Sequence, residues 1–148
     1  MLPAMSTSGN IYIAVIDDDE SGRRSMSRLL RAAHLQPVIY PSAEAFLTDT
    51  NRPTFACLVL DIQLTGMSGL DLRRRLSAVH DVTPVVFITA HDDPAVRAQA
   101  EVSGCAGYFR KTHSGADILA AVRRAIGRED PERVKGSVGG DQPTASTP

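Results

Sequence analysis

Residues 11–20 have the sequence IYIAVIDDDE, in which a run of six apolar residues meets four consecutive acidic residues. An apolar run of this kind, without alternating polar residues, is typical of a strand that is buried on both faces of a parallel sheet. Further apolar runs follow at 38–40, 55–60, 85–88 and 108–109. The sequence therefore predicts a parallel sheet of five strands.

The segments between these runs show the apolar spacing of helices that pack one side against a sheet. The stripes are Met26, Leu29, Leu30 and Ala33; Leu72, Leu76 and Val79; and Ile118, Leu119, Val122 and Ile126. Helix starts are marked by Ser68 with Asp71, by Asp93 with Pro94, and by Ser114 with Asp117. Strands that alternate with helices predict a doubly wound α/β fold, with helices on both faces of the sheet.

The alternating pattern covers residues 10–127, which we expect to form one domain after an N-terminal extension of residues 1–9. Ten of the 21 residues in 128–148 are Gly, Pro, Ser or Thr. Such a segment cannot bury enough apolar surface to offset the entropy lost on ordering. We expect it to be a flexible tail or a truncated linker.

The composition excludes several classes of protein. About 43% of the chain is apolar and its net charge is −1, so it offers no positive field to attract nucleic acid or an anionic membrane. The longest apolar runs have six residues, whereas a membrane-spanning helix needs about 18 or more. Cys57 and Cys105 are 48 residues apart, a spacing that indicates neither a zinc site nor a disulfide framework. The first residues lack the features of a secretion signal, and we expect a cytoplasmic protein.

Polar residues follow four of the predicted strands. They are Asp17–Glu20 after the first strand, Asp61 after the third, Thr89 after the fourth and Lys111 after the fifth. Ligands of an open α/β sheet bind beyond the carboxyl ends of its strands, so these groups are expected to converge. Lys111 is one of two lysines in a chain with 14 arginines, and a compact ammonium suits contact with a single phosphoryl oxygen.

A cluster of Asp17, Asp18 and Asp61 would be unfavourable unless a bound cation or a shift in protonation offset the repulsion. Two carboxylates about 4 Å apart repel by about 4 kcal/mol at an effective dielectric constant near 20. Mg²⁺ prefers such oxygen ligands and works together with phosphates. Carboxylates beside Mg²⁺, with a lysine and a threonine to hold phosphoryl oxygens, form a site in which an aspartate can accept a phosphoryl group.

The chain resembles the receiver domain of two-component response regulators at VIDDDE (15–20), CLVLDIQLTGMSGLDL (57–72), PVVFITAHDD (84–93) and GYFRKT (107–112). The likeness is greatest to the nitrogen-fixation type of regulator, which also matches at 11–20 and at YPSAEAFL (40–47). It covers about residues 10–127. The resemblance implies a flavodoxin-like fold with strand order 2-1-3-4-5 and a switch that is activated by phosphorylation.

The resemblance also implies the ligands of the site. Asp61 is the implied phosphoacceptor, which takes its phosphoryl group from a sensor histidine kinase or a phosphotransfer protein. The implied Mg²⁺ ligands are Asp17, Asp18, Asp61 and the backbone carbonyl of Gln63. Such a domain is not an enzyme in the ordinary sense, because its Mg²⁺-dependent chemistry acts on its own aspartate.

The remaining implied roles concern phosphoryl binding and switching. Thr89, Lys111 and the backbone N–H groups of Ile62 and Ala90 would hold the phosphoryl oxygens. Thr89 and Tyr108 would act as the switch. Their movement would change the surface made by the fourth helix, the fifth strand and the fifth helix, where a downstream protein or a second copy would bind. The 21 residues after Gly127 are too few for a helix-turn-helix effector domain, so we expect a single-domain regulator or a receiver cut from a longer protein.

Two residues depart from the family pattern. Thr65 and Thr112 stand where the family usually has proline, and Thr112 directly follows Lys111. A cis bond costs only about 0.5–1 kcal/mol before proline but about 2.5–4 kcal/mol before other residues. We therefore expect a trans Lys111–Thr112 bond, with Lys111 farther from Asp61 in the resting state.

Two alternatives remain open. A pseudo-receiver would keep the fold as an interaction module without taking phosphate. A haloacid-dehalogenase-type phosphatase would use Asp17 and Asp19 after the first strand, with Ser21, Thr89 and Lys111, but would leave Asp61 without a role. A flavodoxin-like flavin binder is excluded, since four consecutive acids repel the phosphate that its first turn has to hold.

Overall fold

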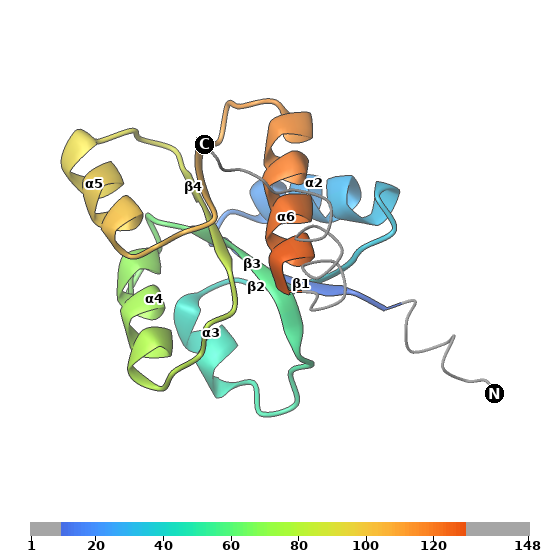
Figure 1. The fold of residues 1–148 in the computed structure, drawn as a ribbon, viewed down its shortest axis with the longest axis horizontal. Helices are drawn as coiled ribbons and strands as arrows, with labels where there is room; N and C mark the ends of the chain where they lie inside the picture. The colour runs from blue at the N-terminus through green and yellow to red at the C-terminus, as the bar shows by residue number, and fades with distance from the viewer. Residues whose placement is uncertain (1–9, 130–148) are drawn as a thin grey trace, which may run out of the picture.

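A computed structural model describes residues 10–129, and within them the chain forms five strands and five helices. The strands are β1 (Tyr12–Ile16), β2 (Gln36–Tyr40), β3 (Phe55–Asp61), β4 (Val85–Thr89) and β5 (Gly107–Arg110). The helices are α2 (Glu20–Ala32), α3 (Ala43–Thr48), α4 (Gly69–Ala78), α5 (Pro94–Val102) and α6 (Gly115–Glu129). Figure 1 shows this strict alternation of strand and helix.

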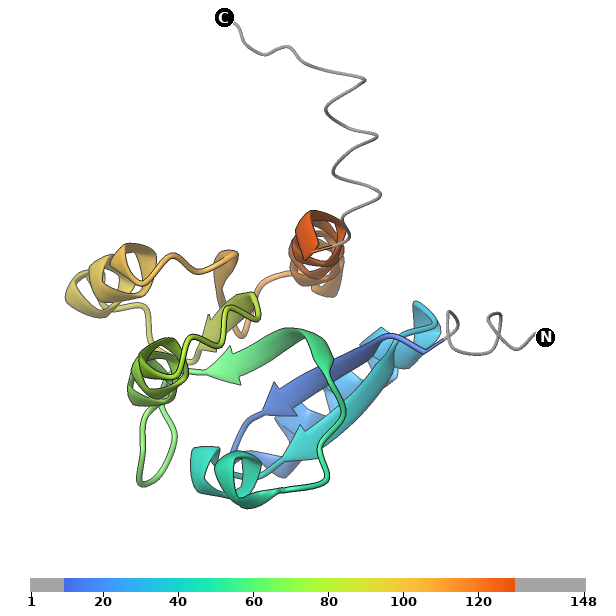
Figure 2. The same ribbon diagram turned by 60° about the horizontal axis from the view of Figure 1, so that its bottom comes forward.

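The sheet has the order β2-β1-β3-β4-β5, and every neighbouring pair of strands is parallel. The strand arrows in Figure 2 therefore run in one general direction. This confirms the predicted doubly wound fold of the flavodoxin-like kind. The chain order reverses between β1 and β3, and such a reversal is where this type of sheet binds its ligands.

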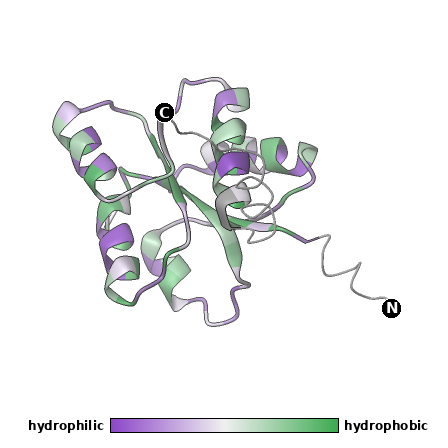
Figure 3. Cartoon of the chain, in the orientation of Figure 1, coloured by the Kyte–Doolittle hydropathy of each residue, from purple (hydrophilic) through white to green (hydrophobic). Residues whose placement is uncertain are grey.

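The helices cover both faces of the sheet, as predicted. Helices α2 and α6 pack on one face through residues such as Leu30 and Val122, against Val15 and Val59 of the central strands. Helices α3, α4 and α5 cover the other face, in a core that includes Phe46. In Figure 1 the two groups of helices lie on opposite sides of the strands, and Figure 3 shows the central strands in the colour of apolar residues.

Side-chain caps fix where the helices begin, and thereby where the loops at the carboxyl edge end. Asp19, Ser42, Ser68 and Asp93 precede α2, α3, α4 and α5, and each side chain accepts a hydrogen bond from a backbone N–H of the first turn. The Ser114 hydroxyl accepts one from Ala116 N at the start of α6. These bonds satisfy N–H groups that lack a partner within the helix. The starts predicted at Ser68, Asp93 and Ser114 are confirmed.

Two details of the sequence prediction were wrong. The edge strands are not buried on both faces: Ile39 of β2 is 49% exposed, because β2 has a neighbour on one side only. Val79 does not continue the apolar stripe of α4. That helix ends at Ala78, and Val79 is 70% exposed in the turn that follows.

The expected extension of residues 1–9 lies outside the described residues. Helix α6 continues to Glu129, so the expected tail begins within its last turn, and the rest of the tail lies outside the described residues as well. No helix in residues 10–129 is long and apolar enough to cross a membrane.

The contribution of the core can be measured with a pair of aliphatic truncations. Leu72 of α4 is fully buried against the sheet, so Leu72→Ala should lower the free energy of unfolding by about 2–5 kcal/mol. Val102 of α5 is 86% exposed, and Val102→Ala should change it by no more than about 0.5 kcal/mol. Urea denaturation followed by circular dichroism measures both values, and equal effects would contradict the described packing.

Candidate functional site

The site lies where the carboxyl ends of β1 and β3 meet. Ile16 of β1 pairs with Leu60 of β3 in the parallel register. Asp17 and Asp61 directly follow these two residues, so both reach the same edge of the sheet. Both side chains are buried: Asp17 is 1% exposed and Asp61 2% exposed. The predicted convergence of these two aspartates is confirmed in the structure.

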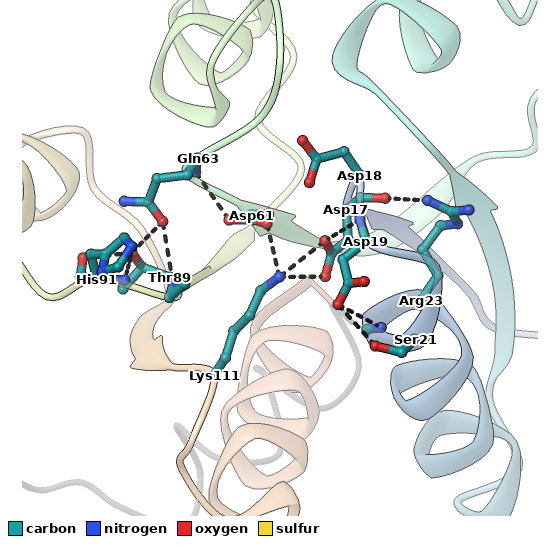
Figure 4. Close-up of polar contacts among 12 residues, drawn as sticks. Asp17, Asp18, Asp19, Ser21, Arg23, Asp61, Gln63, Thr89, His91 and Lys111 are labelled. Atoms are coloured by element: carbon teal, nitrogen blue, oxygen red, sulfur yellow. Dashed lines mark hydrogen bonds and ion pairs between the residues drawn. The ribbon is translucent and has the colours of Figure 1, made fainter.

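Lys111 supplies the counter-charge of this buried pair. Its Nζ lies 3.0 Å from Oδ1 and Oδ2 of Asp17 and 3.0 Å from Oδ2 of Asp61 (Figure 4). The backbone N–H of Lys111 donates to the carbonyl of Thr89 at 2.8 Å, which extends the pairing of β4 with β5 and fixes where the side chain starts. One ammonium thus joins the ends of three strands.

The Lys111–Thr112 bond is trans, as predicted, since the described residues contain no cis peptide bond. The expected consequence for Lys111 was wrong, however, because its ammonium already contacts Asp61 in the resting protein. The long, flexible lysine side chain reaches the carboxylates from a trans backbone. The family's usual proline is therefore not needed to aim this ammonium.

Two glycines allow the helices to approach the buried aspartates. A Cβ atom at Gly22 of α2 would lie 2.5 Å from Oδ2 of Asp17. A Cβ atom at Gly69 of α4 would lie 2.3 Å from the backbone oxygen of Asp61. A side chain at Gly69 would collide with the backbone of Asp61, and one at Gly22 would displace the carboxylate of Asp17, so the two glycines let the first turns of α2 and α4 pack directly against the site.

Burial and charge shift the ionisation of the central groups. Burial raises the pKa of Asp61 to about 6, against the opposing effect of Lys111 and with a further rise from Asp17. Burial by itself would lower the pKa of Lys111, but its hydrogen bonds with Asp17 and Asp61 more than offset this, and the pKa is raised. At neutral pH Asp61 is therefore mostly a carboxylate, and it lies beside the ammonium of Lys111.

Asp18 lies on the exposed side of the cluster and is held by the loop after β3. Its Oδ2 accepts hydrogen bonds from the backbone N–H and the hydroxyl of Thr65, both at 3.0 Å. The carboxylate of Glu44 also holds this loop, because it accepts a hydrogen bond from the N–H of Met67 at 2.8 Å. Proline, the usual family residue at the position of Thr65, could donate neither bond to Asp18.

Carboxylate oxygens of Asp17, Asp18 and Asp61 all lie within 4.8 Å of one another. Three hard oxygen donors at this spacing, with one face open to solvent at Asp18, fit the ligand preference of Mg²⁺. The cluster carries three carboxylates against one ammonium, which favours a further cation. The predicted acidic pocket is therefore assembled in the structure.

Thr89 is fully buried at the end of β4, and Gln63 contacts it. The Thr89 hydroxyl lies 2.7 Å from the side-chain oxygen of Gln63 and 2.7 Å from the carbonyl of His91. The N–H of Ala90 donates to the same oxygen of Gln63 at 3.2 Å. Sequence reasoning considered only the backbone carbonyl of Gln63 and gave no signal for this use of its side chain.

The role expected for the N–H of Ile62 does not agree with the structure. This group donates to the carbonyl of Ile88 at 3.0 Å, because the pairing of β3 with β4 continues one residue beyond Asp61. The N–H that faces the carboxylate of Asp61 belongs to Gln63, which donates to Oδ1 of Asp61 at 3.0 Å. Since strand register was unknown from sequence, the two neighbouring N–H groups could not be told apart.

Comparison with known proteins agrees with this geometry. The family model of the response regulator receiver domain matches residues 13–123. The chain belongs to the response regulator receiver family. The receiver is 34% identical over 114 residues to the response regulator protein TodT of Pseudomonas putida, a match that covers 77% of this chain and 50% of TodT.

Two further relatives agree with the predicted type of receiver. The chain is 35% identical over 119 residues to the transcriptional regulatory protein FixJ of Azorhizobium caulinodans, covering 80% of this chain and 56% of that protein. The solved structure of the response regulator StyR has a TM-score of 0.74 and 33% identity, over 84% of this chain and 63% of StyR. The predicted resemblance to the nitrogen-fixation type is confirmed. The chain spans about half the length of the curated relatives it matches.

Tyr108 of the receiver lies on the side of β5 that faces α5. Its hydroxyl donates to Oδ1 of Asp92 at 3.4 Å, and the guanidinium of Arg97 lies 4.9 Å from the centre of its ring. Burial raises the pKa of Tyr108, and the charge of Asp92 adds to the rise. The ring is therefore in contact with α5 in this structure.

The raised pKa of Asp61 makes this receiver less stable when the carboxyl group ionises. In metal-free buffer at pH 7, Asp61→Asn should increase the free energy of unfolding by about 1–3 kcal/mol, since each pKa unit corresponds to about 1.4 kcal/mol. The pKa rises from 3.8 in the unfolded chain to about 6 in the folded one. The difference between the proteins should therefore be small below about pH 4 and grow as the pH rises to about 6.

Thermal unfolding across this pH range, with a chelator present, measures the difference. Asp93→Asn is the control, because asparagine keeps the acceptor that caps α5. A loss of stability at pH 7 on replacing Asp61 would contradict the electrostatic account.

Proposed function

We propose that this receiver is a phosphorylation-activated switch, in which Asp61 accepts a phosphoryl group from a sensor histidine kinase or a phosphotransfer protein. Receiver domains as a family are signalling modules that interact with histidine kinases and downstream effectors. The observation that carries the proposal is the buried carboxylate of Asp61, held 3.0 Å from the ammonium of Lys111 at the edge of an acidic cluster.

The chemistry follows from the groups around Asp61. With a pKa of about 6, Asp61 is mostly ionised at neutral pH and can act as a nucleophile. An oxygen of Asp61 attacks the phosphorus of a phosphohistidine, the phosphorus–nitrogen bond breaks, and the histidine nitrogen keeps the electron pair and takes up a proton. The ammonium of Lys111 then neutralises part of the charge on the phosphoryl oxygens.

The carboxylates of Asp17, Asp18 and Asp61 and the backbone carbonyl of Gln63 would hold Mg²⁺. When bound, the ion offsets the negative charge that the phosphoryl group brings to a carboxylate cluster. The hydroxyl of Thr89 and the N–H of Ala90 would hold phosphoryl oxygens on the side opposite the acidic cluster. The N–H of Gln63, which donates to Asp61, takes the place that sequence reasoning gave to Ile62.

The output would pass through the surface of α5, β5 and α6. Movement of Thr89 toward the phosphoryl group would free space beside β5, and Tyr108 would leave its contacts with Asp92 and Arg97. A downstream protein or a second copy of the chain would bind the altered surface. We propose a cytoplasmic location, with no direct contact of these residues with nucleic acid or membrane.

The phosphatase alternative is not supported by the contacts of Asp19. Its carboxylate accepts hydrogen bonds from Gly22 N and from the hydroxyl of Ser21, so it serves as the cap of α2. The bond from Ser21 outweighs the effect of burial, and together with the bond from Gly22 N it lowers the pKa of Asp19. A general acid for a leaving group needs a raised pKa instead.

Phosphoryl uptake is tested with a small phosphodonor. Incubation with acetyl phosphate and Mg²⁺ should add the mass of one phosphoryl group to the intact protein, and Asp61→Asn should abolish the addition. Asp93→Asn should be labelled like the unchanged protein. Full labelling of Asp61→Asn would contradict the assignment of the acceptor, and absence of labelling in the unchanged protein would favour the pseudo-receiver.

The metal ligands are tested separately with two neighbouring carboxylates. Asp18→Asn should weaken Mg²⁺ binding about tenfold or more, because it removes one of three anionic ligands. Asp19→Asn should leave the affinity almost unchanged, since asparagine still caps α2. Isothermal titration calorimetry gives both affinities, and equal values for the two variants would argue against Asp18 as a ligand.

A further inference from the structure

The side chain of Gln63 reaches from the loop after β3 to two donors at the end of β4. Its Oε1 lies 2.7 Å from the hydroxyl oxygen of Thr89 and 3.2 Å from the backbone nitrogen of Ala90 (Figure 4). These are the two donors that the proposed function assigns to the phosphoryl oxygens. In the resting protein, the neutral carboxamide oxygen of Gln63 therefore occupies the place that a phosphoryl oxygen would take.

The carboxamide and a phosphoryl oxygen cannot hold both donors at once. The Thr89 hydroxyl and the Ala90 N–H each have one hydrogen to donate. A phosphoryl oxygen that accepted both would have to lie where Oε1 of Gln63 now lies. The backbone of Gln63 is tied to the acceptor through its N–H, which donates to Asp61 at 3.0 Å. The side chain must therefore rotate away while its own backbone stays in the site.

The charge on the competing oxygens sets the direction of this exchange. Hydrogen bonds to an ionised oxygen are roughly twice as strong as those between neutral groups. The phosphoryl group therefore displaces the carboxamide. The hydrogen bonds of Gln63 that must break first reduce the apparent affinity of the site for the phosphoryl group. The carboxamide also keeps the Thr89 hydroxyl in its resting position until that exchange takes place.

Loss of the carboxamide should not unfold the protein. The hydroxyl of Thr89 has a second acceptor, the carbonyl of His91, at 2.7 Å. Ala90 is exposed, so its N–H can bond to water. No buried donor is left without a partner, which is the usual source of large destabilisation in such variants.

We propose that the Gln63 carboxamide is an internal substitute for the phosphoryl group, which holds Thr89 and Ala90 in the resting state and leaves them on phosphorylation. Gln63 is then a positioning residue that acts through Thr89. The inference rests on the proposed function, because that function assigns the two donors to phosphoryl binding.

The resting contact is tested without metal or phosphodonor. Gln63→Met keeps the length of the side chain and removes its acceptor oxygen, and Gln99→Met makes the same change on α5. Amide hydrogen exchange by nuclear magnetic resonance should show faster exchange at Ala90 in Gln63→Met and unchanged exchange in Gln99→Met. Equal exchange at Ala90 in Gln63→Met and the unchanged protein would overturn the inference.

The competition is tested with beryllium trifluoride, a non-covalent substitute for the phosphoryl group, in the presence of Mg²⁺. Its apparent dissociation constant should fall by about threefold to thirtyfold in Gln63→Met, because the Ala90 N–H loses its competing acceptor and the Thr89 hydroxyl keeps only the carbonyl of His91. The melting temperature should stay close to that of the unchanged protein. Equal or weaker binding of beryllium trifluoride by Gln63→Met also overturns the inference.

The two experiments separate failure of the inference from failure of the proposed function. If neither protein binds beryllium trifluoride, phosphoryl binding at Asp61 is contradicted. Amide exchange at Ala90 then still decides whether Gln63 holds this N–H in the resting protein.

Discussion

The ammonium of Lys111 lies 3.0 Å from carboxylate oxygens of both Asp17 and Asp61, and these contacts join the ends of β1, β3 and β5. Two buried carboxylates so close together would repel each other strongly and would be costly to bury unpaired. The ammonium offsets part of this cost, yet the pKa of Asp61 remains raised. The site is therefore assembled in a state that still lacks positive charge, and this favours binding of a cation.

The loop after β3 is organised by the carboxylates around it. Asp61 accepts the N–H of Gln63, Asp18 accepts two bonds from Thr65, and Glu44 accepts the N–H of Met67. The bond from Met67 is the main cause of the lowered pKa of Glu44. A loop held by hydrogen bonds at three points keeps Asp61 and its neighbours in place before any ligand arrives. Such preorganisation lowers the cost of binding an anion beside a carboxylate.

Most of the fold could be predicted from the sequence because its signals are local. The apolar runs that became β1, β3 and β4 are continuous, and the central strands are buried on both faces. Ser68 and Asp93 mark helix starts through bonds to N–H groups only two or three residues away. The errors at Ile39 and Val79 have a common origin, since burial depends on which neighbour lies alongside, and that is not a local property.

The sequence by itself determined the chemistry available at the carboxyl edge: the aspartates at the ends of β1 and β3, Thr89 at the end of β4 and Lys111 directly after β5. Only the tertiary structure decided which partner each of these groups contacts. It directed the N–H of Ile62 into the sheet, brought Lys111 to Asp61 from a trans backbone, and placed the carboxamide of Gln63 on Thr89. Each of these contacts joins residues from different strands or loops, so it depends on strand register and side-chain rotation. The order of residues along the chain fixes neither of these.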